Sequence, residues 1–197
     1  VFSICISLNR CKKDTLPASS MGENPTPAPT PYVYEGELEE YTDWVEHVFF
    51  HPVIAYPKMA FDLDYMSKGV DDYFVTAQEF SRIIEQMYEK NYILVDINDV
   101  YEFDEAKGRY RQKTLMLPPG KIPFILSIDD LNYYEYMIAN GTVHKLVLDE
   151  NGEVAAYTVD PDTGEEQIRR DLAIVPLLDD FIKQHPDFSW KNAKGLI

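Results

Sequence analysis

The sequence predicts an α/β fold that carries an inserted antiparallel β-meander. Strand-like apolar runs alternate with a strongly periodic helix in the first half of the chain. The run after Gly120 is apolar on both faces, which is typical of a buried strand in a parallel sheet. Three short segments between residues 143 and 170 are separated by turn-forming residues. The strand–helix–strand order together with these hairpins indicates an α/β domain with a β insert.

Composition limits the classes of protein that the chain can belong to. Its 197 residues suit one domain or one domain with a tail, and 45% hydrophobic residues are enough for a real core. The formal net charge of −16 argues against a surface for nucleic acids or anionic membranes, because both are polyanions. Cys5 and Cys11 have no zinc-ribbon spacing.

The first eight residues form an apolar stub, VFSICISL. It is too short to span a membrane and resembles the end of a signal peptide or anchor. Three interpretations stay open: a cut transmembrane anchor, a lipoprotein signal with the lipid on Cys11, or no function. Arg10 departs from the small residues that lipoprotein signals place before the cysteine.

Residues 14–31 form a linker with prolines at positions 25, 27, 29 and 31. Proline-rich spacers stay extended, so this one would hold a domain away from its attachment point. We therefore predict an anchor or signal remnant with a linker over residues 1–31 and the folded part over residues 32–197. Such an order is typical of an extracytoplasmic domain at the cell surface or in the secreted fraction.

The folded part begins with weak signals and then a clear strand and helix. Leu38–Glu46 is predicted as a short helix or turn, and Val48–Ile54 as a buried strand. Thr76 and Glu79 have capping-box spacing and predict the start of a helix that ends at Lys90–Asn91. Its core-facing residues at helical spacing are Phe80, Ile83, Ile84, Met87 and Tyr88.

A second strand and a polar stretch precede the central apolar run. Tyr92–Ile97 is predicted as a buried strand, and Asp99–Arg111 as a polar loop. The next strand follows the Pro-Pro-Gly turn at 118–120 and stops at Asp129. Beyond it, Tyr133–Ala139 is predicted as a short helix that ends in an Asn-Gly turn.

The meander and a final helix complete the expected elements. The meander strands are Val143–Leu148, Glu153–Val159 and Glu165–Arg170. Leu172–Gln184 is predicted as a helix, and Ala193–Ile197 as the opening of another strand. We expect the sequence to be a part of a longer protein at both ends. The residues of the final helix expected to face the core are Val175, Leu178, Phe181 and Ile182.

Two adjacent carboxylates, Asp129 and Asp130, end the central strand. Ligands of α/β folds collect at the carboxyl ends of parallel strands, so a metal or proton-transfer site is expected there. The alternative is structural, because aspartate is also a good N-cap for a following helix.

Histidines and tyrosines supply further candidates. His47 and His51 would share one face of a helix, but the residues between them favour a strand, along which they lie about 13 Å apart. That separation is too large for one zinc ion. His51 alone could line a cleft at the strand end. Tyr133, Tyr134 and Tyr136, beside the carboxylates, could stack on sugar rings or pack in the core.

Four stretches resemble the N-terminal part of NodB-type polysaccharide deacetylases, the carbohydrate esterase family 4 type, and in particular a secreted Gram-positive group. They are VFFHPVIAYP, FVTAQEFSRIIEQMYEKNYILVDINDVYE, LPPGKIPFILSIDDLNYYEYM and LLDDFIKQHPDFSWKNAKGLI, and the resemblance covers residues 44–197. Its most specific piece is the strand end, where the family form is Thr-Phe-Asp-Asp-Gly. This chain keeps Asp129 and Asp130 but has Ser127, Ile128 and Leu131 at the other positions.

The resemblance implies a partial NodB-like distorted (β/α) barrel with the β-meander as an insertion. It implies that Asp129 is a catalytic general base and that Asp130 binds a divalent metal, Zn. The family takes two further ligands from a histidine motif, and nothing after Asp130 matches it. The resemblance therefore also implies that this chain is inactive alone.

The expected function is a metal-dependent hydrolase that removes acetyl groups from a cell-surface polysaccharide. The alternative is a non-catalytic surface module that binds a glycan or another envelope protein. The expected partner is a cell-wall or surface polysaccharide, contacted by His51, Tyr133 and Tyr134. No nucleic acid is expected, and membrane contact is expected only through the N-terminal anchor.

Overall fold

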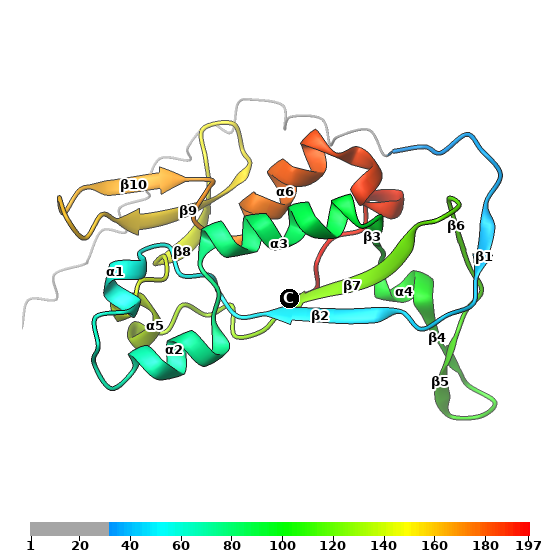
Figure 1. Ribbon diagram of the computed structural model, residues 1–197, viewed down its shortest axis with the longest axis horizontal. Coiled ribbons are helices and arrows are strands. Elements are labelled where there is room, and N and C mark those ends of the chain that lie inside the picture. The colour runs from blue at the N-terminus through cyan, green and yellow to red at the C-terminus, as the bar shows by residue number, and fades with distance from the viewer. Residues whose placement is uncertain (1–31) are drawn as a thin grey trace, which may run out of the picture.

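A computed structural model describes residues 32–197 (Figure 1). The predicted anchor, the lipid on Cys11 and the proline-rich linker lie outside the described residues. Among residues 32–197, every helix is too short or too polar to cross a bilayer.

The fold is mixed α/β, as predicted, and its strands form four separate sheets within residues 32–197. These strands do not close into a barrel. In chain order the strands are β1 Glu39–Tyr41, β2 Glu46–Phe50, β3 Tyr92–Leu94, β4 Tyr101–Asp104, β5 Arg109–Gln112, β6 Leu115–Leu117, β7 Ile122–Ile128, β8 Lys145–Leu148, β9 Val154–Val159 and β10 Glu166–Arg169.

The helices flank the sheets, and two of them are long. α3 (Ala77–Glu89) and α6 (Ile174–Gln184) run side by side above β2 and β7 (Figure 1). The short helices are α1 Pro57–Ala60, α2 Ser67–Tyr73, α4 Ile97–Val100 and α5 Glu135–Ala139, with 3-10 turns at Pro186–Phe188 and Trp190–Asn192.

The central sheet is parallel, with the strand order β2-β7-β3. β7 pairs with β2 from Glu46↔Phe124 to Phe50↔Ile128, and with β3 over the three pairs that end at Leu94↔Phe124. The predicted buried strand before Asp129 is therefore confirmed as the middle strand. Because both of its edges are paired and its residues 123–126 are buried, an apolar run is the sequence that this stretch requires.

The last residues pair with the part of β7 that β3 leaves free. The Leu196 N–H donates to the Leu126 carbonyl at 2.9 Å, and the Ile128 N–H donates to the Leu196 carbonyl at 2.8 Å. These two bonds form a parallel bridge between Ser127 and Leu196. The expected strand opening at 193–197 is thus present as a single bridge.

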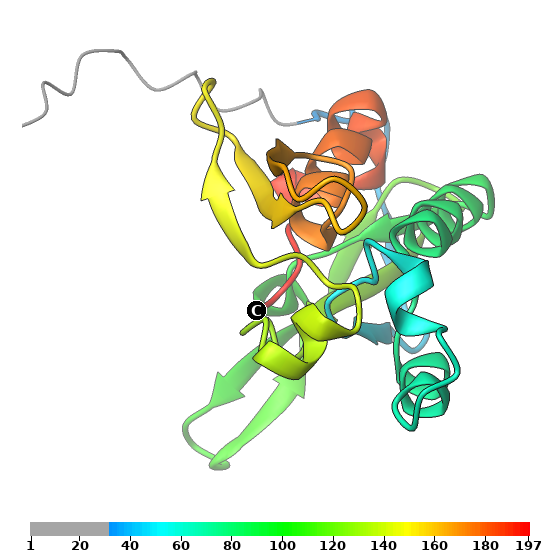
Figure 2. The same ribbon diagram turned by 90° about the vertical axis from the view of Figure 1, so that its left-hand side faces the viewer.

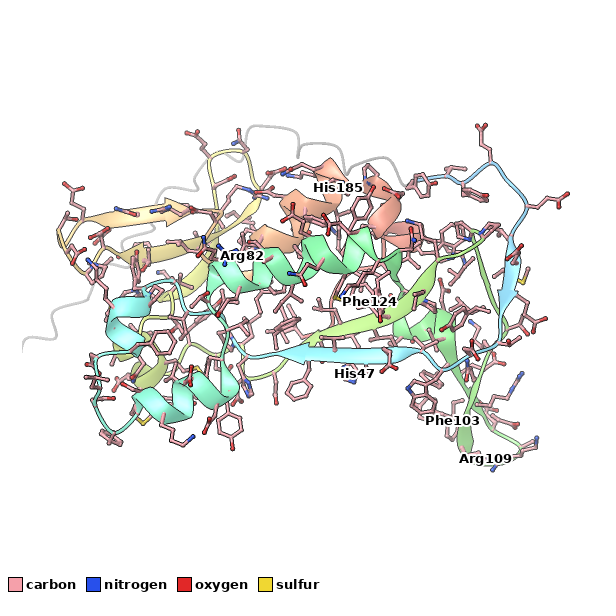
Figure 3. The ribbon with its side chains drawn as sticks, viewed as in Figure 1. His47, Arg82, Phe103, Arg109, Phe124 and His185 are labelled. Carbon is pink, nitrogen blue, oxygen red and sulfur yellow. The ribbon has the colours of Figure 1, made fainter. Side chains whose placement is uncertain are left out.

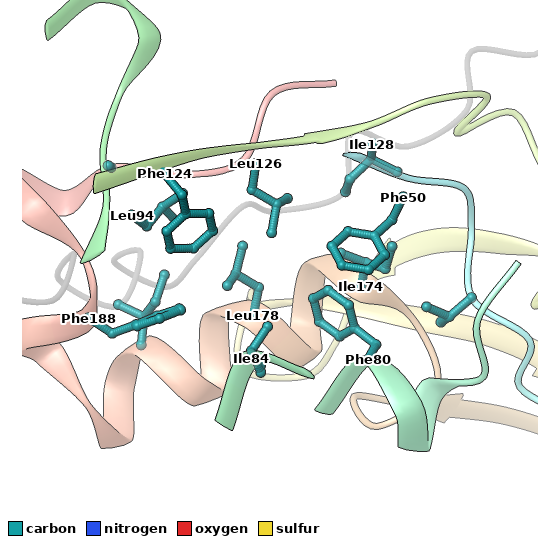
Figure 4. Close-up of a cluster of buried hydrophobic side chains, with 13 residues drawn as sticks. Phe50, Phe80, Ile84, Leu94, Phe124, Leu126, Ile128, Ile174, Leu178 and Phe188 are labelled. Atoms are coloured by element: carbon teal, nitrogen blue, oxygen red, sulfur yellow. The ribbon is translucent and has the colours of Figure 1, made fainter. Parts of the chain in front are cut away.

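One face of the central sheet packs against α3 and α6. Phe124, Leu126 and Ile128 of β7 all point toward these helices (Figure 4). Phe50 of β2 meets Phe80 of α3 edge to face, with ring centroids 5.0 Å apart. We call this side the covered face. Its buried residues are Phe50, Val53, Phe80, Ile84, Leu94, Phe124, Leu126, Ile128, Ile174, Leu178, Ile182, Phe188 and Ala193.

The capping box predicted for α3 is confirmed. The Thr76 hydroxyl accepts a bond from the Glu79 N–H at 3.1 Å, and the Glu79 carboxylate accepts one from the Thr76 N–H at 2.8 Å. These reciprocal bonds satisfy donors that the first turn of a helix leaves free. The helix ends at Glu89, and Asn91 follows with a positive φ of 63°.

The opposite face is packed only toward the amino ends of its strands. A second cluster there surrounds Ile125 and includes residues from β3, β6 and α4. Its buried members are Val45, Ile93, Val95, Val100, Leu115, Leu117, Ile125 and Trp190.

Two local predictions are wrong. Leu38–Glu46 contains β1, which pairs antiparallel with β6, so distant residues rather than local propensity set its conformation. Asp99–Arg111 contains most of the β4–β5 hairpin, which projects from the molecule (Figure 1). The alternation of Tyr101 and Phe103 with charged residues is a strand pattern, and Gly108 with a φ of 58° makes the turn.

Two predicted strands have other bounds than expected. The strand predicted as buried over Val48–Ile54 is β2, which begins at Glu46 and has only Phe50 buried, so its predicted burial is wrong. It ends at Phe50, before Pro52, which has no N–H to give to a ladder. β3 ends at Leu94, because Asp96 then caps α4 by accepting a bond from the Asn98 N–H at 2.7 Å.

The predicted meander is confirmed, with the strand order β10-β9-β8. It lies against α6 (Figure 2). Arg170, just after β10, joins the two by donating to the Asp180 carboxylate at 3.0 Å and to the Val154 carbonyl at 2.8 Å.

Candidate functional site

The two predicted carboxylates lie exposed at the carboxyl end of β7. The Asp129 N–H still donates to the Phe50 carbonyl at 2.8 Å, so the neighbouring strand holds this residue in place. Asp130 has a positive φ of 56° and turns the chain out of the sheet. The Asp129 carboxylate accepts a bond from the Asp130 N–H at 2.9 Å, which fixes the turn. Both side chains remain open to solvent.

The structural alternative for this pair, the capping of the next helix, is wrong. α5 begins at Glu135, its N-cap residue is Tyr134, and no side chain caps it. Four residues separate Asp130 from Glu135, the first residue of α5, and the chain turns within that segment. Apart from the Asp129 oxygen that accepts the Asp130 N–H, the exposed oxygens of the pair are therefore available for a ligand or a proton.

His51 lies beside this pair. Because Phe50 and Ile128 are register partners, His51 and Asp129 are the next residues of adjacent strands. A hydrogen bond of 3.0 Å joins His51 Nδ1 to the Tyr73 carbonyl, and the ring rests on Phe74 with centroids 5.1 Å apart. These contacts fix the imidazole and leave Nε2 without a partner among residues 32–197.

The predicted tyrosines separate into buried and exposed ones. Tyr133 is only 9% exposed and packs in the cluster with Val143 and Leu172. Burial raises the pKa of Tyr133, so its hydroxyl stays protonated. Of the two alternatives given for these rings, the position of Tyr133 favours core packing.

Tyr134 and Tyr136 form an exposed ring pair instead. Their rings are nearly parallel, at 11°, with centroids 6.0 Å apart, and both are about half exposed. The Asn132 amide donates to the Tyr134 hydroxyl at 3.0 Å. Partial burial, with the negative charge of Asp130 as a smaller cause, raises the pKa of Tyr136. The charge of Asp130 therefore acts on the Tyr136 hydroxyl.

The described residues alone do not fit a zinc site. Among residues 32–197, no three His, Cys, Asp or Glu side chains converge to hold a metal ion. Asp129 and Asp130 would supply at most two carboxylates. His47 is four residues from His51 along an extended segment, and a hydrogen bond of 2.8 Å joins its Nε2 to Ser127 Oγ. The zinc ion therefore stays a prediction.

Sequence reasoning missed the contact between His47 and Ser127 and the exposure of Phe49 beside it. His47 and Ser127 are 80 residues apart in the chain, and only the register of β2 against β7 brings them together. Phe49, paired in register with Ser127, is 59% exposed. The available signal was the two-residue period of a strand, which puts His47 and Phe49 on one face and Phe50 on the other.

A separate cavity of about 550 Å³ lies at the amino end of α3. Thr76, Arg82 and Asp171 are among its lining residues, and none of the predicted site residues is. We therefore place the candidate site at the strand end, on its chemistry, and not in this cavity.

No known protein family, characterised protein or solved structure matches this chain. The resemblance to polysaccharide deacetylases therefore rests on the sequence stretches quoted above.

Proposed function

We propose that the carboxyl end of β7 is the glycan site of a polysaccharide deacetylase-like domain at the cell surface. The observation that carries the proposal is the position of Asp129 and Asp130. They are exposed, they do not cap a helix, and they end the central strand of a parallel sheet. Ligands of α/β folds bind at the carboxyl ends of the strands of such a sheet.

Asp129 is proposed as the general base. A carboxylate at this position can take the proton of a water molecule that attacks the acetyl carbonyl carbon. The bond from its own N–H to the Phe50 carbonyl fixes its backbone, and the bond from the Asp130 N–H orients its carboxylate. The bond from the acetyl carbon to the glycan nitrogen or oxygen then breaks, and the proton held by Asp129 passes to that leaving atom, which gives the deacetylated glycan and acetate.

Asp130 is proposed as a ligand of a divalent metal, Zn, on the resemblance alone. A bound zinc ion would polarise the acetyl carbonyl. Because residues 32–197 bring no group of three ligands together, we assign no step to the metal and expect this chain alone to release no acetate.

The ring pair of Tyr134 and Tyr136 is proposed to bind the polysaccharide beside the carboxylates. Aromatic rings present flat apolar surfaces, and their hydroxyls stay available for hydrogen bonds. The free Nε2 of His51 adds one more polar contact at the same strand end. The role of Tyr133 in substrate binding stays a prediction, because its ring is buried.

The second candidate function is a non-catalytic module that binds a surface glycan or an envelope protein. Ser127, Ile128 and Leu131 favour it, since they replace three residues of the family pattern around the two aspartates. Both candidates use the same strand end. They differ in whether Asp129 takes part in a reaction or only accepts hydrogen bonds.

Two measurements on the chain test what the candidates share, the binding of a glycan and the lack of activity of this chain alone. The first is calorimetric binding of an acetylated chitooligosaccharide, and the second is acetate release in the presence of zinc. We expect binding that Tyr134→Ala and Tyr136→Ala weaken, and no acetate release. An absence of binding would contradict both candidates. Zinc-dependent release would contradict the view that further ligands are needed.

The role of Asp129 is tested in any longer form of the protein that releases acetate. Asp129→Asn should lower the rate about 100- to 10,000-fold, the usual loss for a general base, with oligosaccharide affinity retained. Asp162→Asn, an exposed carboxylate on the β9–β10 turn, is the matched control and should leave the rate unchanged. An unchanged rate in Asp129→Asn would leave the non-catalytic function.

A further inference from the structure

The turn from Asp130 to Tyr133 leads from the strand end into α5, and its backbone has an uncommon conformation. The φ values of Asp130 and Tyr133 are 56° and 47°. Positive φ is uncommon for residues with a Cβ, and more so for a bulky tyrosine than for an aspartate. The Asn132 N–H also donates to the Asp130 carbonyl at 2.6 Å. Such a turn persists only where the surrounding structure holds it in place.

The side chain of Tyr133 is what anchors this turn to the rest of the fold. Tyr133 is 9% exposed, whereas Asn132 before it and Tyr134 after it are exposed. Its ring packs in a buried cluster that includes Val143 and Ala156, the second of which belongs to β9 of the meander. A buried aromatic ring contributes a large apolar area to the core, so its packing offsets the strain of the positive φ.

The other end of α5 is fastened by backbone contacts. The Gly141 carbonyl accepts bonds from the Ala55 N–H at 2.8 Å and from the Tyr56 N–H at 2.9 Å. Gly141 has a φ of 89°, and a Cβ there would lie 2.4 Å from the Tyr56 carbonyl oxygen, so only glycine allows this approach. Because α5 lies between Tyr133 and Gly141, the ring of Tyr133 is the attachment that is nearer to the strand-end carboxylates.

We propose that Tyr133 is a positioning residue of the strand-end site, whose buried ring, seated against the meander, fixes the turn that presents Asp130 and Tyr134. Asp130 lies three residues before the ring, and Tyr134 directly follows it. Tyr133 thus acts through these neighbours and does not touch the glycan. The meander takes part in the site, because Ala156 forms part of the seat. This role rests on the proposed function, since it concerns the same strand end.

The first test is amide hydrogen exchange, measured by NMR on the 197-residue chain without a glycan. The Asp130 N–H donates to the Asp129 carboxylate and the Asn132 N–H to the Asp130 carbonyl, so both amides report on the turn. Tyr133→Ala should speed their exchange about tenfold, because the turn then opens locally. Tyr133→Phe keeps the ring and should leave both rates unchanged. Unchanged rates in the alanine variant would overturn the positioning role.

The second test is calorimetric binding of an acetylated chitooligosaccharide. Tyr133→Ala should lower the affinity about tenfold, because binding must then order the turn. Tyr133→Phe should bind as the wild type does. A loss in Tyr133→Phe as large as in Tyr133→Ala would overturn the positioning role, because the hydroxyl would then contact the glycan directly.

Three further variants serve as controls. Tyr133→Leu keeps an apolar side chain, covers the case in which the alanine variant does not fold, and should show the same changes at a smaller size. Ile84→Ala truncates a residue of a different buried cluster, so it lowers stability but should leave turn exchange and affinity unchanged. Phe103→Leu replaces an exposed ring on the β4–β5 hairpin, away from the strand end (Figure 3), and should change neither. Urea unfolding would show that each variant is folded.

The possible results separate the positioning role from the proposed function. Faster turn exchange in Tyr133→Ala, with no binding of the oligosaccharide to the wild-type chain, would overturn the proposed function and leave Tyr133 as the anchor of the turn. Binding that Tyr134→Ala weakens and Tyr133→Ala leaves unchanged would overturn the positioning role alone.

Discussion

The two faces of the β2–β7 pair are built from the same two strands and differ in what packs against them. The covered face meets α3 and α6 and is apolar at every position of β7. On the opposite side, the open face, no helix lies above the carboxyl half of the two strands. The side chains on that half are His47, Phe49, Ser127 and Asp129. A residue of these strands is therefore accessible to solvent and to a ligand where no helix packs over its face, whichever of the two strands it belongs to.

Phe49 and Phe50 give this comparison its most direct form. They are consecutive residues of one strand with the same side chain, and they are 59% and 8% exposed. The difference between them comes from side-chain alternation and from the packing of α3 over one side only.

The largest expected effect is on stability, from truncation on the covered face. Phe50→Ala should lower the free energy of unfolding by about 3–5 kcal/mol, because it leaves a cavity against Phe80. Phe49→Ala should change the free energy of unfolding by no more than about 0.5 kcal/mol, as for other exposed positions. Urea unfolding of both variants measures the difference. Similar losses in the two would mean that something packs on the open face.

The sequence alone predicted the elements whose determining contacts are local. The α3 capping box could be predicted because Thr76 and Glu79 are three residues apart. The hairpin turns of the meander could be predicted for the same reason. β1 was not, since its strand conformation depends on pairing with β6 from another part of the chain.

The candidate site was predictable in its type and not in its extent. Asp129 and Asp130 follow an apolar run, and that pattern predicted their place at the carboxyl end of the central strand. The His47–Ser127 contact depends on the register between two strands far apart in the chain, and no local pattern records it. The burial of Tyr133 depends in the same way on a meander residue, Ala156, that lies in the same buried cluster.

A medium effect is expected at the cap of α3, which lies on the covered face only. Thr76→Ala should lower the free energy of unfolding by about 1 kcal/mol, the usual value for the loss of an N-cap side chain. A similar loss in a serine variant would argue against the cap, because serine keeps the hydroxyl. Urea unfolding near neutral pH is the measurement.

The same cap gives a pH dependence of known sign. Hydrogen bonds from the Thr76 N–H and hydroxyl hold the pKa of Glu79 below its usual value. The charged carboxylate therefore stabilises the fold above the unfolded-state pKa, and this contribution is lost as the pH falls through the lower, folded-state pKa. Between about pH 6 and pH 3, Glu79→Gln should lose less stability than the wild type. Glu85→Gln, on the same helix, is the control.

A small effect on stability is expected at Asp130, beyond the carboxyl end of β7. Its φ of 56° is a conformation that glycine adopts freely. Asp130→Gly should therefore change the free energy of unfolding by less than about 1 kcal/mol, although it removes a proposed ligand. Asp130→Ala should be about 1 kcal/mol less stable than Asp130→Gly, because alanine resists this conformation. Equal stabilities would mean that the turn relaxes in the variants.

The parallel pairing of β2 with β7 also sets an order of events for a growing chain. His47 and Ser127 are 80 residues apart, so β2 has no strand partner until β7 has been made. At a synthesis rate of about 5–20 residues per second, that interval is roughly 4–16 s. During this time the α3–β3 hairpin can form from local contacts, while Phe49 and Phe50 both stay unpaired. Within the central sheet, β2 is therefore the segment that waits longest for its partner, and it is the one most exposed to aggregation during that interval.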